Sequence, residues 1–175
     1  KVGRELIALL LADGADVFAT DVNDAALQRL SSDHPSVRVV NSVADAPVDV
    51  YAPCALGATL TPMSAQTIEA KLVCGAANNQ LATPDVELLL GRRGITWVPD
   101  FVANAGGLIQ VADELEGFDF ERAKQRASGI FDTTREVLRR AEDDRALVVV
   151  AVPMRAVASV LDQVTEFAPS CGITD

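Results

Sequence analysis

Apolar and polar residues alternate along the chain in blocks that predict helices and strands in turn. The chain opens with an amphipathic helix that ends at Asp13-Gly14 and whose apolar residues share one face: Val2, Leu6, Leu9 and Leu10. Short apolar runs predict buried strands over residues 15–21, 37–41, 48–53, 71–77 and 95–100. The remaining periodic segments predict helices that start at Asn23 or Asp24, cover 61–70 and 84–93, follow Asn104, and run from 119 to about 142.

This alternation predicts an α/β fold, a Rossmann-like doubly wound parallel sheet with helices on both faces. The helices over 61–70 and 84–93 each follow Thr-Pro, a capping residue with proline at the first helical position. Ligands of such sheets bind outside the carboxyl ends of the strands. Polar or glycine-rich turns follow four strand-like runs: Asp21, Pro53-Cys54-Ala55, Asn78-Asn79 and Asn104-Ala105-Gly106-Gly107. Each is an ordinary turn by itself, but together they predict a cofactor crevice.

The start of the chain matches the end of a dinucleotide-binding fingerprint. In G-x-G-x-x-G the third glycine lets helix and strand pack closely, and an acid about 20 residues on holds the ribose hydroxyls. Gly3 fits that glycine, and Asp21, 18 residues later, fits the acid. We therefore expect an N-terminally truncated sheet, whose first strand and first two glycines are missing from this chain. Its neighbours over 15–21 and 48–53 would lose ladder hydrogen bonds, so we expect a fragment that is not stable alone.

Composition narrows the class of protein. The length of 175 residues fits one domain, and the net charge of −10 argues against nucleic acid or an anionic membrane as a partner. No apolar run reaches the roughly 18 residues of a membrane helix. Three cysteines without a CxxC motif favour free thiols in a reducing cytoplasm. The one histidine, His34, lies in a polar turn without a second ligand nearby, so no metal site is expected.

Three runs resemble the amino-acid dehydrogenases that act on leucine, valine and phenylalanine. They are DVYAPCALGATL (49–60), GAANNQL (75–81) and PDFVANAGGLIQVADELEGFDFERA (99–123), and the last looks most like the valine and leucine enzymes. The resemblance covers Lys1 to about Asp144 and implies the C-terminal, NAD-binding domain of this glutamate-dehydrogenase-like family. Beyond Asp144 we expect it to fade.

The resemblance implies positions for the cofactor NAD. Asn104 would hydrogen-bond the nicotinamide carboxamide, and Asn78 would lie near the nicotinamide ribose. Asp21 at a strand end accepts ribose hydroxyls but repels a 2′-phosphate, which favours NAD over NADP. The other expected cofactor-binding positions are Lys1, Val2, Gly3, Val22, Cys54, Ala55 and Ala76. For Cys54, a packing role is favoured over a reactive thiol, because no His or Lys is adjacent in sequence.

Substrate choice is argued from Leu108 and Val111, three residues apart on one helix face. In the family these positions help to line the side-chain pocket, and an apolar pair cannot satisfy a buried carboxylate. The alternative is that both are core residues. No catalytic residue is expected in this chain, since the family's lysines and aspartate belong to an N-terminal domain and Lys71 and Lys124 lie in other contexts.

These observations predict a dinucleotide-binding domain over 1–144, and a segment of uncertain structure over 145–175. The apolar run at 145–161 fits either a strand followed by a helix or a translated frameshift. The expected function is oxidative deamination of branched-chain L-amino acids to 2-oxo acids and ammonia, by a homo-oligomer with a separate catalytic domain. A phenylalanine dehydrogenase and a non-catalytic nucleotide-binding or regulatory module are the alternatives.

Overall fold

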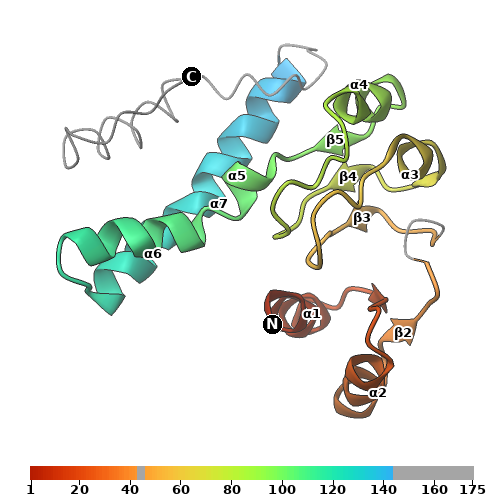
Figure 1. Cartoon of the computed structure of the whole chain (residues 1–175), viewed down its shortest axis with the longest axis horizontal. Helices are drawn as coiled ribbons and strands as arrows, with labels where there is room; N and C mark the ends of the chain where they lie inside the picture. The colour runs from red at the N-terminus through yellow and green to blue at the C-terminus, as the bar shows by residue number, and fades with distance from the viewer. Residues whose placement is uncertain (43–45, 144–175) are drawn as a thin grey trace. The chain divides into compact units, whose positions relative to one another are not determined.

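The computed structural model describes residues 1–42 and 46–143, which fall into two compact units. The first covers Lys1–Asn104, and the second begins at Ala105. Each unit is described by itself below, and Figure 1 gives the element labels. The predicted segment at 145–175 lies outside the described residues. Among the helices within the described ranges, none is both long and apolar enough to cross a membrane.

The first part of unit one is a βαβ arrangement preceded by a helix. Its elements are α1 (Val2–Ala12), β1 (Phe18–Ala19), α2 (Asp24–Asp33) and β2 (Arg38–Val39). The two strands are parallel, with Phe18 opposite Arg38. Asn23 is the N-cap of α2, because its side-chain oxygen accepts the backbone N–H of Ala26 at 3.1 Å. The predicted helix start is thereby confirmed and the choice between Asn23 and Asp24 is settled.

The packed face of α1 differs from the one that the sequence pattern predicts. Ile7, Leu10 and Leu11 pack against the buried cluster of β1, α2 and β2, formed by Val17, Ala19, Leu30 and Val37. Val2 and Leu9 are 58% and 66% exposed. The predicted stripe is therefore right at Leu10, which packs, and wrong at Val2 and Leu9, because spacings of three and four residues occur on both faces of this leucine-rich helix.

The second part of unit one is a three-stranded parallel sheet with the order β3-β4-β5. Its elements are β3 (Val50–Tyr51), α3 (Pro62–Thr67), β4 (Leu72–Val73), α4 (Asp85–Arg92) and β5 (Thr96–Trp97). Helices α3 and α4 lie side by side (Figure 1). Val86 and Leu90 of α4 are fully buried, and each contributes about 1.5–3 kcal/mol to stability.

The two Thr-Pro sequences behave differently. Thr61 caps α3 in a capping box, in which its hydroxyl accepts the N–H of Ser64 and the Ser64 hydroxyl accepts the N–H of Thr61. In α4 the N-cap is Pro84, and no side chain caps the helix, so the predicted cap by Thr83 is wrong. The box requires a hydroxyl or carboxyl group three residues after the cap, and α4 has Val86 there.

The run over 95–100 does not stay extended to its end. The strand β5 stops at Trp97, and the short helix α5 (Asp100–Ala103) begins at Asp100. Pro99 separates the two, and its φ of −54° suits the entry to a helix. The chain therefore reaches Asn104 through a helical turn and not through a continuous strand.

The parallel strands form two separate sheets. Within the described residues, β1 pairs only with β2, and β3 pairs only with β4 on one side. The α/β class with parallel sheets is confirmed. In the described residues β1 and β3 each keep a free edge, as do β2 and β5, and a strand between β1 and β3 stays a prediction.

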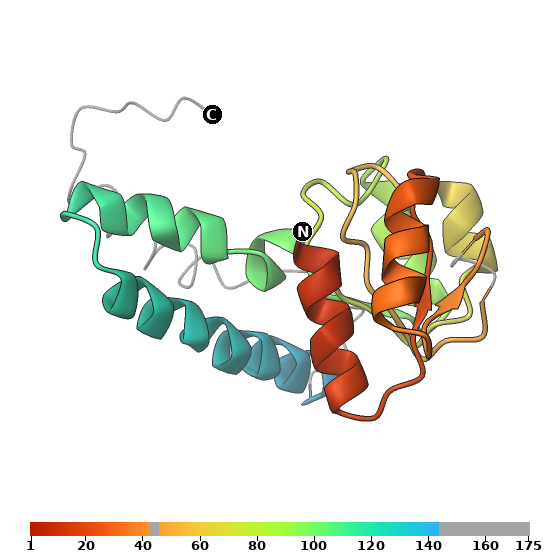
Figure 2. The ribbon, with the colours of Figure 1, turned by 90° about the horizontal axis from the view of Figure 1, so that it is seen from below.

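Unit two is a helical hairpin of α6 (Gly106–Leu115) and α7 (Phe120–Asp143), which lie side by side in Figure 2. At the turn, the fully buried Asp113 carboxylate accepts from Arg122 Nε at 2.6 Å, Arg126 at 3.2 Å and the N–H of Asp119 at 2.8 Å. This network closes the hairpin. The predicted long helix from 119 to about 142 is confirmed.

Candidate functional site

The candidate residues of unit one follow the carboxyl ends of its strands. The turns after β3 and β4 are joined by a hydrogen bond from Ala77 N–H to Pro53 O at 2.9 Å. Gly75 comes so close to this turn that a Cβ atom would lie 2.2 Å from Pro53 O. Only glycine fits there, because the obstacle is backbone that cannot move aside. The backbones of the turns after β3 and β4 are thus held in close, fixed contact.

Two predicted amide side chains meet beside the turn that follows β4. Asn104 Nδ2 donates to Asn78 Oδ1 at 2.6 Å and approaches Ala76 O at 3.4 Å. The contact brings together the turns after β4 and α5, which are 26 residues apart in sequence. Asn78 is exposed and Asn104 is half-buried. Three sequence-predicted positions therefore share one hydrogen-bonded cluster with an accessible face.

A second pair of predicted positions meets at the start of α1. A Cβ atom on Gly3 would lie 3.4 Å from Cys54 Cβ, an ordinary contact distance, so this packing is close without itself requiring glycine. Cys54 and Cys74 are free, half-buried thiols. Burial, with a smaller contribution from Cys54, raises the pKa of Cys74, so that thiol is poorly nucleophilic.

Other predicted positions at this end of the sheet are accessible. Lys1 is the N-cap residue of α1 without a side-chain cap, and both Lys1 and Val2 are exposed, as is Ala55. Asp21, directly after β1, is exposed, and its Oδ1 accepts the N–H of Asn23 at 2.9 Å. The next residue, Val22, is 98% exposed. The carboxylate of Asp21 is therefore held by a local turn with its other oxygen directed to no described partner.

The predicted pocket residues belong to unit two. Leu108 and Val111 of α6 are 57% and 56% exposed. The alternative that they are core residues is therefore wrong for the described part of the chain. A Cβ atom built on Gly106 or Gly107 meets no described atom within 4 Å. The space beside these two glycines at the start of α6 is therefore open, although glycine is a poor helix former.

Two buried polar residues were not singled out from the sequence. Gln80 is 1% exposed and Asp113 is fully buried. Gln80 lies within the GAANNQL run. Its burial depends on residues that are near it only in the folded structure, so the sequence pattern does not reveal it. Asp113 is followed by Arg122 and Arg126, but nothing in a linear pattern separates this pairing from a solvated charge cluster.

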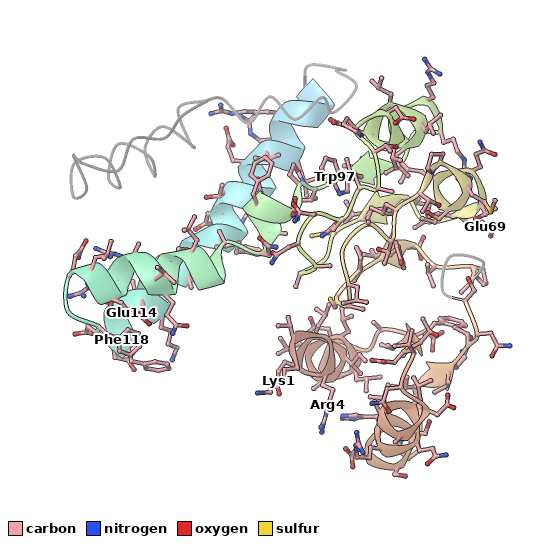
Figure 3. The ribbon with its side chains drawn as sticks, in the orientation of Figure 1. Lys1, Arg4, Glu69, Trp97, Glu114 and Phe118 are labelled. Carbon is pink, nitrogen blue, oxygen red and sulfur yellow. The ribbon has the colours of Figure 1, made fainter. Side chains whose placement is uncertain are left out.

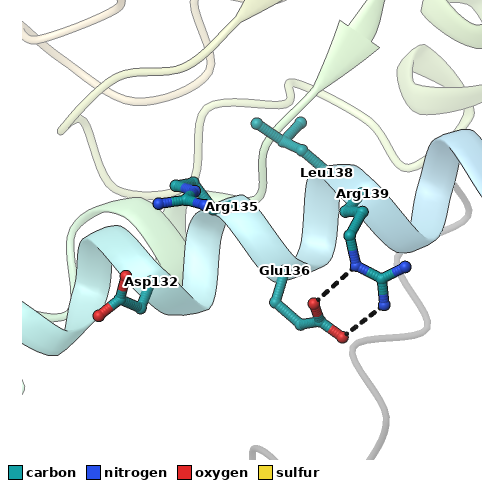
Figure 4. A pocket seen from close by; sticks show the side chains of 5 residues that line it. All are labelled: Asp132, Arg135, Glu136, Leu138 and Arg139. Carbon is teal, nitrogen blue, oxygen red and sulfur yellow. Dashed lines mark hydrogen bonds and ion pairs between the residues drawn. The ribbon is translucent and has the colours of Figure 1, made fainter.

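The surface hollow shown in Figure 4 lies elsewhere, along one face of α7. Its lining residues are Asp132, Arg135, Glu136, Leu138 and Arg139. Hydrogen bonds from Arg139 and Arg140 lower the pKa of Glu136 to about 2. All five residues belong to α7, four of them are charged, and none is a predicted site residue. No group of three metal-ligating side chains occurs in the described ranges.

The fold and the strand-end cluster define an α/β protein in which a hydrogen-bonded amide cluster follows the carboxyl ends of parallel strands, where ligands of such sheets bind. The family model for the glutamate/leucine/phenylalanine/valine dehydrogenases matches residues 9–165, and the chain belongs to this family. The match continues past Asp144, so the expectation that the resemblance fades there is wrong. The expectation came from the apolar run after that residue, which does not look like the family's usual charged helix.

Individual relatives agree with the family. The chain is 53% identical over 148 residues to valine dehydrogenase of Streptomyces virginiae, covering 82% of this chain and 41% of that protein. It is 39% identical over 152 residues to leucine dehydrogenase of Bacillus cereus, covering 86% of the chain and 42% of that protein. The crystal structure of L-tryptophan dehydrogenase from Nostoc punctiforme superposes with a TM-score of 0.77 at 32% identity, over 83% of this chain and 44% of that one. The chain thus spans about two fifths of the length of these curated relatives.

Proposed function

We propose that this chain is the NAD-binding part of a dehydrogenase that oxidatively deaminates branched-chain L-amino acids, such as valine or leucine, to 2-oxo acids and ammonia. The observation that carries the proposal is the hydrogen-bonded cluster of Asn78, Asn104 and Ala76 at the carboxyl ends of the strands. The 53% identity to a valine dehydrogenase supports the branched-chain class. In this proposal residues 1–144 form the dinucleotide-binding domain.

The donor chemistry of the cluster fits a nicotinamide. A side-chain amide has two donors and an acceptor, and the contact between Asn104 and Asn78 uses one donor and one acceptor. In the described part of the chain, the Asn104 oxygen and the Asn78 nitrogen keep capacity for a carboxamide and a ribose hydroxyl. NAD, when bound, would supply a hydride acceptor, and Asn78 and Asn104 would orient its nicotinamide ring so that one face meets the substrate.

The adenosine end would be held at the other strand ends. The exposed carboxylate of Asp21 would accept two ribose hydroxyls and would repel the 2′-phosphate of NADP. The start of α1, with Lys1, Val2 and Gly3, would lie near the phosphates, where backbone N–H groups favour an anion. The positions of Val22, Cys54 and Ala55 would complete the lining.

Substrate selection would fall to Leu108 and Val111. Both are exposed on α6 and available to a ligand. An apolar pair favours an aliphatic side chain over that of glutamate, because an unpaired carboxylate there would lose its hydration without compensation. The groups that move the proton and activate water would belong to a separate catalytic domain, and the enzyme would act as a homo-oligomer. A phenylalanine dehydrogenase is the neighbouring alternative.

The test is to express the complete reading frame that contains this chain and to follow NADH formation at 340 nm with valine, leucine, phenylalanine and glutamate. We expect turnover with the aliphatic substrates, NAD preferred over NADP, and little turnover with glutamate. Asn104→Leu keeps the size of the side chain but removes the amide, and we expect this variant to lose most of its turnover of the aliphatic substrates. Cofactor binding without turnover of any of the four would instead support a regulatory nucleotide-binding module.

A further inference from the structure

The turn that carries Ala76 and Asn78 is fastened from inside the protein by one side chain. Gln80 Nε2 donates to the carbonyl oxygens of Gly75 at 2.8 Å and Ala77 at 3.1 Å. Its Oε1 accepts the indole N–H of Trp97 at 3.1 Å. Trp97, labelled in Figure 3, belongs to β5 and is itself buried. A single buried amide thus ties both ends of the turn to the neighbouring strand.

The same turn is also held on its other side. The Asp100 carboxylate accepts the N–H of Asn79 at 2.6 Å, and the N–H of Ala58 donates to Asn79 O at 2.7 Å. Asn79 has a φ of +50°, a left-handed conformation that asparagine tolerates better than most residues. Hydrogen bonds from Gln80 on one side of Asn78 in the sequence, to Gly75 and Ala77, and to Asp100 on the other side, from Asn79, restrict how far the backbone at Asn78 can shift.

Asn104 depends on this turn for its orientation. Its amide nitrogen contacts two acceptors, Asn78 Oδ1 and Ala76 O, and both belong to the segment that Gln80 holds. A displacement of the turn would move both acceptors together. Gln80 is thus hydrogen-bonded to the segment that contains both acceptors, and at 1% exposure it is not accessible to a ligand.

We propose that Gln80, through its bond to Trp97, is a positioning residue that sets the nicotinamide end of the cofactor site. The proposal rests on the proposed function, because it concerns the half of NAD that Asn78 and Asn104 would contact. It assigns no contact between Gln80 and cofactor. It separates the site into an adenosine end, held at β1, and a nicotinamide end, whose geometry is set by this buried bond network.

The experiment measures the dissociation constants of NAD and of ADP-ribose for the complete enzyme by calorimetry. ADP-ribose lacks only the nicotinamide, so the ratio of the two constants isolates contacts at that end. Gln80→Met keeps the length of the side chain and removes all three hydrogen bonds. We expect its NAD affinity to fall about tenfold, the scale of one lost hydrogen bond, with ADP-ribose affinity unchanged.

A second variant and a control keep the test decisive. Trp97→Phe removes the indole donor together with part of the ring, and we expect a smaller loss of NAD affinity in the same direction, which can be measured even if Gln80→Met does not fold. Val86→Ala, in the core of α4, is expected to lower thermal stability without changing the ratio. If the Gln80→Met variant bound NAD and ADP-ribose equally weakly relative to the wild type, or bound both as tightly as the wild type, the positioning role would be overturned. Failure of the wild type to bind NAD would overturn the proposed function and this inference with it.

Discussion

Asp21 is the residue on which cofactor choice depends in the proposed site. Its side chain is exposed and is held by one local hydrogen bond to the N–H of Asn23. Asp21→Asn keeps that acceptor and the size of the group but removes the charge. We expect NAD affinity to fall about tenfold, because charge-assisted bonds to the ribose hydroxyls are lost, and NADP affinity to rise.

Titration calorimetry with both cofactors measures these affinities for the complete enzyme. Asp24→Asn, at the first residue of α2, is the matched control and is expected to leave the ratio of NAD to NADP affinity unchanged. An unchanged ratio in Asp21→Asn would place the selectivity for the 2′ position elsewhere.

At the scale of single elements, the α6–α7 hairpin depends on Asp113. Hydrogen bonds from Arg122 and from the N–H of Asp119, opposed by desolvation, lower the pKa of Asp113. An aspartate in an unfolded chain titrates near about 3.9. Because the folded pKa lies below the unfolded one, the ionised group stabilises the hairpin above about pH 4, and this stabilisation is lost as the pH falls through the folded value.

Asp113→Asn is therefore expected to be less stable than the wild type at pH 7, with a gap that narrows below about pH 4. Urea unfolding of the product of the complete reading frame, with and without the substitution, measures this gap at pH 7 and pH 3. Asp132→Asn, on the exposed face of α7, is expected to match the wild type at both values. A gap of the same size at pH 3 as at pH 7 would show that the loss is one of packing and not of charge.

The elements were predictable where the signal is local, and wrong where neighbours decide. Asn23 and Thr61 cap their helices through atoms three residues away, so the sequence contains the whole interaction. The packed face of α1 depends on the sheet beneath it, and Leu9 and Leu10 are equally apolar in a linear pattern. The strand ladders have two residues each, shorter than the apolar runs, because buried residues such as Val17 and Val98 extend beyond the paired positions.

In the candidate site, too, residues in a local motif were predictable and residues that depend on distant neighbours were not. Asn78 and Asn104 were found through a family motif, and the structure brings them within 2.6 Å. Gln80 lies two residues from Asn78 and was missed, because its importance depends on carbonyl groups and an indole that only the fold brings together. Burial of a polar group has no periodic signature when the residue lies in a turn.

At the scale of the whole molecule, the division of the strands into two sheets leads to a prediction about how fast backbone amides exchange their hydrogens with solvent. The free edges of β1 and β3 lack a partner in the described residues. If the complete reading frame supplies a strand between them, amides over 15–21 and 48–53 should exchange at least roughly tenfold more slowly than in the 175-residue chain. Hydrogen exchange with mass spectrometry compares the two products directly.

Amides of α4 provide the internal control, since that helix packs on the three-stranded sheet and should exchange alike in both products. Protection of β1 and β3 in the 175-residue chain equal to that in the longer product would contradict the missing-strand hypothesis.

The contact of Gly75 with Pro53 has a consequence for how descendants of this protein can change. A side chain at position 75 would strike backbone, so every functional lineage must retain glycine there. Asp21 is under no such packing restraint, because its side chain is exposed and meets only a local turn. In the proposed site, cofactor preference could therefore change at the end of β1 by single substitutions, while the junction of the turns after β3 and β4 is inherited unchanged.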